Sequence, residues 1–124
     1  MQIARIGLAL TVALVIFGLA ASCQTLALTG AKKYKVDLTQ VMMKIQAEIE
    51  QDGEVSDRTV EKLENLINAS RDEYGKKGSF IRSEYVLETL KQAKEKPDEK
   101  FQILRSTSVV CDEVLEMLKT EVTH

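Results

Sequence analysis

Apolar residues recur at intervals of three and four positions through most of this chain, and this spacing constrains its fold more than any other feature. The pattern is longest near the C-terminus, where it extends over three heptads. Its members are Phe101, Leu104, Ser108, Cys111, Leu115, Leu118 and Val122. Residues spaced in this way lie on one face of an α-helix, so the stretch predicts a helix over 98–122 with a broad buried face.

The same spacing predicts three further helices, which cover 37–52, 56–74 and 79–96. Asp37, Ser56 and Ser79 are suitable N-caps, because an oxygen on a short side chain can accept hydrogen bonds from the free N–H groups of the first turn. Gly53 and Pro97 mark helix ends. The connections are short and no alternating strand pattern occurs, so the sequence predicts an all-α fold, a small up-down four-helix bundle.

The first 23 residues have the composition of a secretory signal. Arg5 gives a positively charged start, an apolar run follows from Ile6 to Ala21, and small residues precede Cys23. A charged start, an apolar middle and a small-residue end are the three parts of a signal that a peptidase removes.

This signal resembles that of the bacterial lipoprotein class. The residues that match the box of that class are Leu19, Ala20, Ala21, Ser22 and Cys23. The resemblance implies that the thiol of Cys23 receives a diacylglyceryl group and that Cys23 becomes the first residue of the mature chain. It also implies a location in the bacterial cell envelope, at the outer membrane of a Gram-negative cell, because Gln24 stands where an aspartate would retain the protein at the inner membrane.

Two other fates also fit this segment. Ordinary signal cleavage would release a secreted chain, either beginning at Cys23 or lacking it. An uncleaved single-pass anchor is the other, because the apolar run with its weakly polar tail reaches Leu28 and is about 23 residues long, enough to span a bilayer. The lysines at 32, 33 and 35 outweigh Arg5, which argues against leaving the tail outside the cell.

The chain divides into three predicted parts, namely a signal peptide over 1–22, a lipidated cysteine with a basic tether over 23–35, and a helical domain over 36–124. Next to a membrane, the tether lysines would attract anionic lipid. A solvated linker is the alternative for the same residues. A core of this size is small for a stable domain, so self-association into a homo-oligomer is a further expectation.

The composition argues against several functions. The chain has 17 basic and 19 acidic residues, a formal charge of −2, which is not the balance of a nucleic-acid-binding protein. The single histidine, His124, is the last residue, where a general base is poorly held. Metal-ligand and phosphate-loop motifs do not occur. We therefore expect no enzyme activity, no cofactor and no nucleic-acid partner, and instead a domain that binds an unknown protein partner or supports an envelope assembly.

One acidic segment, Glu48–Asp57, is the best candidate for a ligand site. Its residues resemble an EF-hand calcium loop, in which oxygen ligands at alternating positions converge on one ion. The candidate ligands are Glu48, Glu50, Asp52, Glu54 and Ser56. Thr59 stands where that loop has its bidentate carboxylate. The alternative to an ion- or ligand-responsive sensor is a plain helical hairpin, with Gly53 ending one helix and Ser56 capping the next.

A second apolar stripe runs beside the main one in the last predicted helix. It comprises Ile103, Val110, Val114 and Met117. The two stripes together make an apolar surface wider than three short neighbouring helices need to cover. We therefore predict a partly exposed interface there. Cys111 lies in the main stripe, where it is expected to be a small buried hydrophobic residue; an intermolecular disulfide is the alternative.

Overall fold

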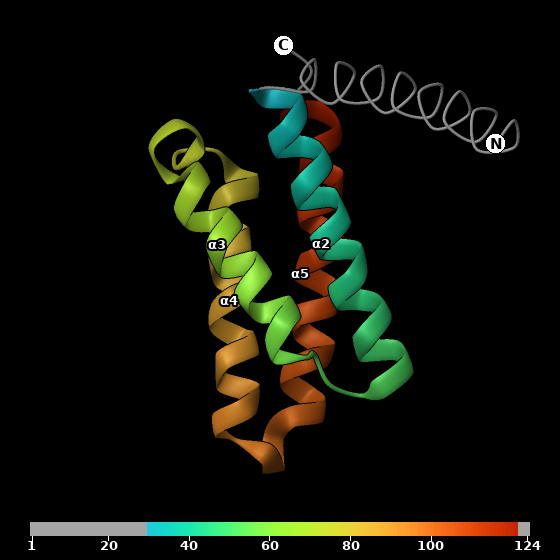
Figure 1. Cartoon of the computed structure of the whole chain (residues 1–124). Helices are drawn as coiled ribbons and strands as arrows, with labels where there is room; N and C mark the ends of the chain where they lie inside the picture. The colour runs from blue at the N-terminus through green and yellow to red at the C-terminus, as the bar shows by residue number, and fades with distance from the viewer. Residues whose placement is uncertain (1–29, 122–124) are drawn as a thin grey trace, which may run out of the picture. The chain divides into compact units, whose positions relative to one another are not determined.

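The computed structural model describes residues 30–121, and within that range every regular element is helical (Figure 1). The elements are α2 (Ala31–Asp52), α3 (Asp57–Tyr74), α4 (Gly78–Glu95), the short 3₁₀ turn η1 (Pro97–Glu99) and α5 (Lys100–Glu121). In this part of the chain, no helix combines the length and the apolar character that crossing a membrane requires. Cys23, the rest of the predicted signal, Val122 and His124 lie outside the described residues.

The four long helices form a closed ring. α2 packs against α3 and α5, and α4 packs against α3 and α5, so each helix has two neighbours. Short connections at 53–56, 75–77 and 96–99, the last of which includes η1, reverse the chain direction each time. The predicted all-α up-down four-helix bundle is thereby confirmed (Figure 1).

The core occupies the centre of this ring. Its buried apolar side chains are Tyr34, Leu38, Val41, Met42, Ile45, Val55, Leu63, Ile67, Tyr74, Phe80, Val86, Leu90, Ala93, Leu104, Cys111, Val114 and Leu118. Gly53 ends α2 in the left-handed conformation, with φ +70°, as the sequence predicts. Ser56 caps α3 by accepting a hydrogen bond from the Thr59 amide, also as predicted.

The first helix begins earlier than the sequence suggests. α2 starts at Ala31, so Asp37 lies inside the helix and is not its N-cap. Lys33 forms an ion pair with Asp37 at 2.8 Å, one turn along the helix. Tyr34 is only 4% exposed and stacks on Tyr74, with 4.2 Å between the ring centroids. Burial of this aromatic ring explains why residues 31–35 are part of the folded domain and not of a flexible tether.

Ser79 also has a different role from the predicted one. α4 starts at Gly78, with Lys77 at the cap position, so Ser79 lies in the first turn. Its hydroxyl group pairs with the hydroxyl group of Tyr34 at 2.7 Å. Its amide donates instead to the carboxylate of Glu121, at 3.2 Å from either oxygen. A carboxylate from another helix therefore accepts the hydrogen bond of a free N–H group at the start of α4. The residues next to Ser79 in the sequence do not indicate this contact.

The buried face of α5 is shifted from the predicted stripe. Its buried residues are Leu104, Thr107, Cys111, Val114 and Leu118. Thr107 is buried where the predicted stripe has Ser108, and Val114 is buried where it has Leu115, which is only partly buried. Phe101, also in the predicted stripe, is 76% exposed. The shift follows from a buried hydrogen bond of 2.7 Å between the hydroxyls of Thr107 and Thr89, which lies on α4.

Candidate functional site

Glu48, the first ligand of the predicted calcium loop, is engaged in helix capping. Its two carboxylate oxygens accept hydrogen bonds from the Ser56 amide at 2.8 Å and from the Thr59 hydroxyl at 2.6 Å. Burial raises the pKa of Glu48, but these hydrogen bonds outweigh it and hold the pKa below its usual value. Glu48 therefore joins the end of α2 to the start of α3.

The other predicted ligands do not converge on a common point. Glu50 and Asp52 are exposed residues of the helix α2, which continues through the positions where an EF-hand loop would turn. Glu54 reaches across to Lys100, with 3.5 Å between the charged atoms. Within residues 30–121, no group of three or more histidine, cysteine or acidic side chains is arranged to hold a metal ion. The expected cation loop is therefore wrong in its geometry, and the hairpin alternative describes this segment.

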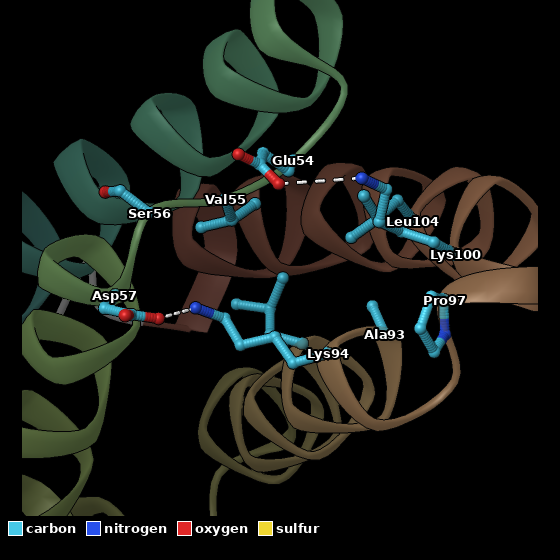
Figure 2. Close-up of a pocket in the computed structure, with 10 residues that line it drawn as sticks. Glu54, Val55, Ser56, Asp57, Ala93, Lys94, Pro97, Lys100 and Leu104 are labelled. Carbon is cyan, nitrogen blue, oxygen red and sulfur yellow. Dashed lines mark ion pairs between the residues drawn. The ribbon is translucent and has the colours of Figure 1, made fainter.

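The same segment borders a cleft of about 390 Å³ at the end of the bundle where α2 gives way to α3 (Figure 2). Two ion pairs cross its rim, Glu54 with Lys100 and Asp57 with Lys94. Val55 lies between them and is 5% exposed. Since each lysine already faces a carboxylate, the cleft has no unpaired charge of one sign among its lining residues, and its contacts fasten the α2–α3 loop to α4 and α5.

The predicted interface on α5 is only partly correct. Val114 is fully buried and belongs to the core, because the α5 face is rotated as described above. Ile103 and Val110 are partly buried and pack against the edge of the core, and Met117 is also partly exposed. These three side chains lie on the flank of α5 that faces α4.

Two exposed side chains of α4 extend this surface. Ile81 and Tyr85, one turn apart, are each 53% exposed. α4 and α5 are antiparallel, and contacts between Arg82 and Glu113 and between Thr89 and Thr107 fix their register. Tyr85 lies between those two contact points, so it is opposite the part of α5 that carries Val110.

A shallow groove continues the surface from Tyr85 to Ile103. We name the set Ile81, Tyr85, Ile103, Val110 and Met117 the α4–α5 face. Neither Ile81 nor Tyr85 was among the interface residues that the sequence predicted. The serine pair Ser79 and Ser83 is the signal that could have shown the exposure of Ile81 and Tyr85. These serines occupy the buried side of α4, so Ile81 and Tyr85 lie on its outer side.

Cys111 is enclosed between the helices and makes no disulfide. Burial, with a smaller contribution from the charge of Asp112, raises the pKa of its thiol to about 12. A thiol in that state is protonated at neutral pH and a poor nucleophile. The expected role as a buried apolar residue agrees with this geometry.

No protein-family model, curated protein or solved structure matches this chain. The function proposed below therefore depends on the chain's own residues and contacts.

Proposed function

We propose that this chain is a bacterial envelope lipoprotein, anchored through a lipid on Cys23, whose helical domain acts by binding another protein. The anchor is supported by the small-residue box before Cys23 at the end of an apolar run. The binding role is supported by the α4–α5 face. In this proposal the bundle is a rigid platform held at a membrane, and its exposed side chains select the partner.

The exposure of Tyr85 is the observation that carries the binding role. A tyrosine that is 53% exposed beside an equally exposed isoleucine leaves apolar surface in contact with water, which disfavours the unbound state. Aromatic residues are enriched at protein interfaces because they bury a large area and lose few rotamers. The partly exposed Ile103, Val110 and Met117 continue this apolar surface along α5.

A contact role is favoured over catalysis because four side chains that could take part in chemistry, Glu48, Cys111, Thr89 and Thr107, are engaged in the fold. Glu48 accepts two hydrogen bonds within the α2–α3 connection. Cys111 is a buried, protonated thiol. The hydroxyls of Thr89 and Thr107 face each other in the interior. Each group contributes to the fold, and none opens onto a cavity beside a suitable base.

Capture of the partner from native membranes tests this function. The full chain would carry Ile81→Lys and Tyr85→Lys, which place charge on the α4–α5 face without disturbing buried groups. Met43→Lys is the matched control, because Met43 is 58% exposed on α2, outside that face. We expect the double variant to keep its helix content and melting temperature but lose the proteins that the wild type and the control capture.

Two outcomes would change this conclusion. Equal capture by all three chains would contradict an interface at the α4–α5 face. If the only protein captured is a second copy of this chain, and the double variant captures less of it, then the α4–α5 face joins two copies in a homo-oligomer and does not bind a different protein.

A further inference from the structure

Three segments of the domain meet at one end, which we name the basal end and define as residues 30–36, 74–79 and 117–121. Tyr34 connects the start of α2 to α3 and α4, since it stacks on Tyr74 and pairs with Ser79. Glu121, the last residue of α5, accepts the Ser79 amide. The first turn of α2, the α3–α4 turn and the last turn of α5 therefore lie at the same end of the bundle (Figure 1).

The basal end is rich in lysine. Residues 31–36 contain Lys32, Lys33 and Lys35 and no acidic residue, and the α3–α4 turn adds Lys76 and Lys77. Lys33 forms an ion pair with Asp37, and Lys77 donates to the backbone carbonyl of Glu121. Among the described residues, Lys32, Lys35 and Lys76 take part in no ion pair, and each is at least partly exposed.

Few carboxylates oppose these lysines. The acidic side chains at this end are Asp37, which pairs with Lys33, Asp72 and Glu73 in the last turn of α3, and Glu121 at the end of α5. The carboxylate of Glu121 is already held by the start of α4. The ammonium groups at 32, 35 and 76 are therefore available to a negatively charged surface.

The opposite end of the bundle has a net negative charge. Residues 48–57, where α2 ends and α3 begins, carry Glu48, Glu50, Asp52, Glu54 and Asp57 and no basic residue. Residues 94–100 at that end carry three lysines and three acidic residues, which balance, and two of these lysines pair with Glu54 and Asp57. An anionic surface would attract the basal end and repel this distal end. The two ends thus give the domain an electrical polarity along its long axis.

The length of chain between Cys23 and the domain fixes which end can lie near the lipid. Seven residues lie between Cys23 and Ala31, and these eight Cα–Cα steps allow a separation of about 29 Å at full extension. α2 has 22 residues and is about 33 Å long. The tether joins the domain at its basal end and is shorter than the bundle. It therefore cannot reach far enough for the distal end to lie against the bilayer while the basal end points away from the membrane.

We propose that the basal end is a membrane-docking surface that binds anionic phospholipid headgroups through Lys32, Lys35 and Lys76, a proposal that rests on the lipid anchor at Cys23. The docked domain stands on the bilayer with its basal end down. The α4–α5 face then runs up the side of the domain, open to a partner, and the acidic distal end points away from the membrane. Screening limits the attraction to charges within about 8 Å of the surface at physiological salt, so the basal lysines dominate it.

Lysine acetylation in vesicles tests this docking with the full chain as purified from bacterial membranes. The chain would be reconstituted into phosphatidylcholine vesicles and into vesicles of equal parts phosphatidylcholine and phosphatidylglycerol. A water-soluble acetylating reagent reacts only with neutral amines. The surface potential of an anionic membrane, about −30 mV, raises the local proton concentration about threefold and slows acetylation by the same factor.

We expect this slowing at Lys32, Lys35 and Lys76 in the anionic vesicles, and none at Lys96, near the distal end. High salt should abolish it. In the wild type, the neighbouring Lys33 and Lys77 should be acetylated more slowly in the anionic vesicles as well. A variant with Lys32→Gln, Lys35→Gln and Lys76→Gln should lose this protection of Lys33 and Lys77. The control with Lys44→Gln, Lys62→Gln and Lys96→Gln removes the same number of charges and should retain the protection of Lys33 and Lys77.

Equal acetylation rates in the two kinds of vesicle would overturn the docking surface. Protection of Lys62 together with the basal lysines would also overturn it, because the domain would then lie on its side. Flotation of the chain with neutral vesicles is measured in parallel. Failure to float would refute the lipid anchor itself, whereas flotation without protection would refute only the docking.

Discussion

The hydroxyl groups of Thr89 and Thr107 lie 2.7 Å apart in the interior, between α4 and α5. Each hydroxyl also approaches a carbonyl of its own helix, at 2.9 Å from Val86 and 2.8 Å from Ile103. Two hydroxyls have two hydrogens, which cannot serve three contacts at once. Two hydroxyl oxygens 2.7 Å apart would repel without a hydrogen between them, so one threonine donates to the other instead of to its own carbonyl, and the two side chains behave as a unit.

This pairing predicts non-additive mutations. Thr89→Val and Thr107→Val should each lower the free energy of unfolding by about 1 kcal/mol, because each leaves a buried hydroxyl with an incomplete set of partners. The double variant should be no worse than either single one, since both polar groups are then gone. Denaturant unfolding of the four chains gives the coupling energy. Strictly additive losses would mean that the two hydroxyls act independently.

The capping role of Glu48 predicts a pH-dependent stability. Its pKa is lowered in the folded state, so the ionised form stabilises the fold above the usual carboxyl pKa, and this stabilisation is lost as the pH falls through the lowered value. Glu48→Gln should lower stability at neutral pH by about 1 kcal/mol, as the loss of a cap does.

Melting temperatures of the wild type and Glu48→Gln across the acidic range test this. The difference between the two chains should shrink as the pH falls. Glu50→Gln is a matched control, because Glu50 is an exposed residue of the same helix, and it should leave the pH profile unchanged. A difference that stays constant with pH would rule out Glu48 as the titrating cap.

Two leucines of α5 provide a test of its buried face. Leu118 is 1% exposed, whereas Leu115 is only partly buried at the edge of the core. Leu118→Ala should cost about 2–5 kcal/mol, the range for a fully buried leucine. Leu115→Ala should cost less than half of that. Denaturant melts that rank the two variants in the opposite order would show that the face of α5 is misassigned.

The thiol of Cys111 predicts slow chemistry. With a pKa near 12 and no exposed surface, it should not react with a thiol reagent under native conditions. It should react fully once denaturant unfolds the domain, with a rate that follows global opening. Rapid native labelling, or a covalent dimer through Cys111 in non-reducing conditions, would contradict the buried position.

Periodicity predicted the helices well, because a bundle buries one face of each helix and spacing records that face directly. The helices that it predicted over 37–52 and 56–74 contain the core residues Leu38, Met42, Ile45, Leu63 and Ile67, and it placed Gly53 and Ser56 at the turn between them. It failed where polar residues are buried. Thr107 and Thr89 pair in the interior, so the α5 face follows Thr107 and not the more apolar Leu115.

Contacts between distant residues account for the other differences. The start of α2 depends on Tyr34 meeting Tyr74 and Ser79, and the start of α4 depends on Glu121, more than 40 residues away. The acidic segment contains oxygen ligands in a calcium-like order, yet α2 continues to Asp52 and Glu48 is bound by Thr59. A pattern along the chain specifies neither the helix length nor these partners, so the sites were less predictable than the fold.

The mass of the mature N-terminal peptide tests the central proposal most directly. The protein would be purified from membranes of a bacterial host and digested, and the N-terminal peptide analysed by mass spectrometry. We predict a peptide that begins at Cys23 and carries a diacylglyceryl group on its sulfur, with or without a third acyl chain on its amine. A chain that retains Met1, or an unmodified peptide that begins at or after Cys23, would contradict the lipid anchor and with it the membrane-held platform proposed for this domain.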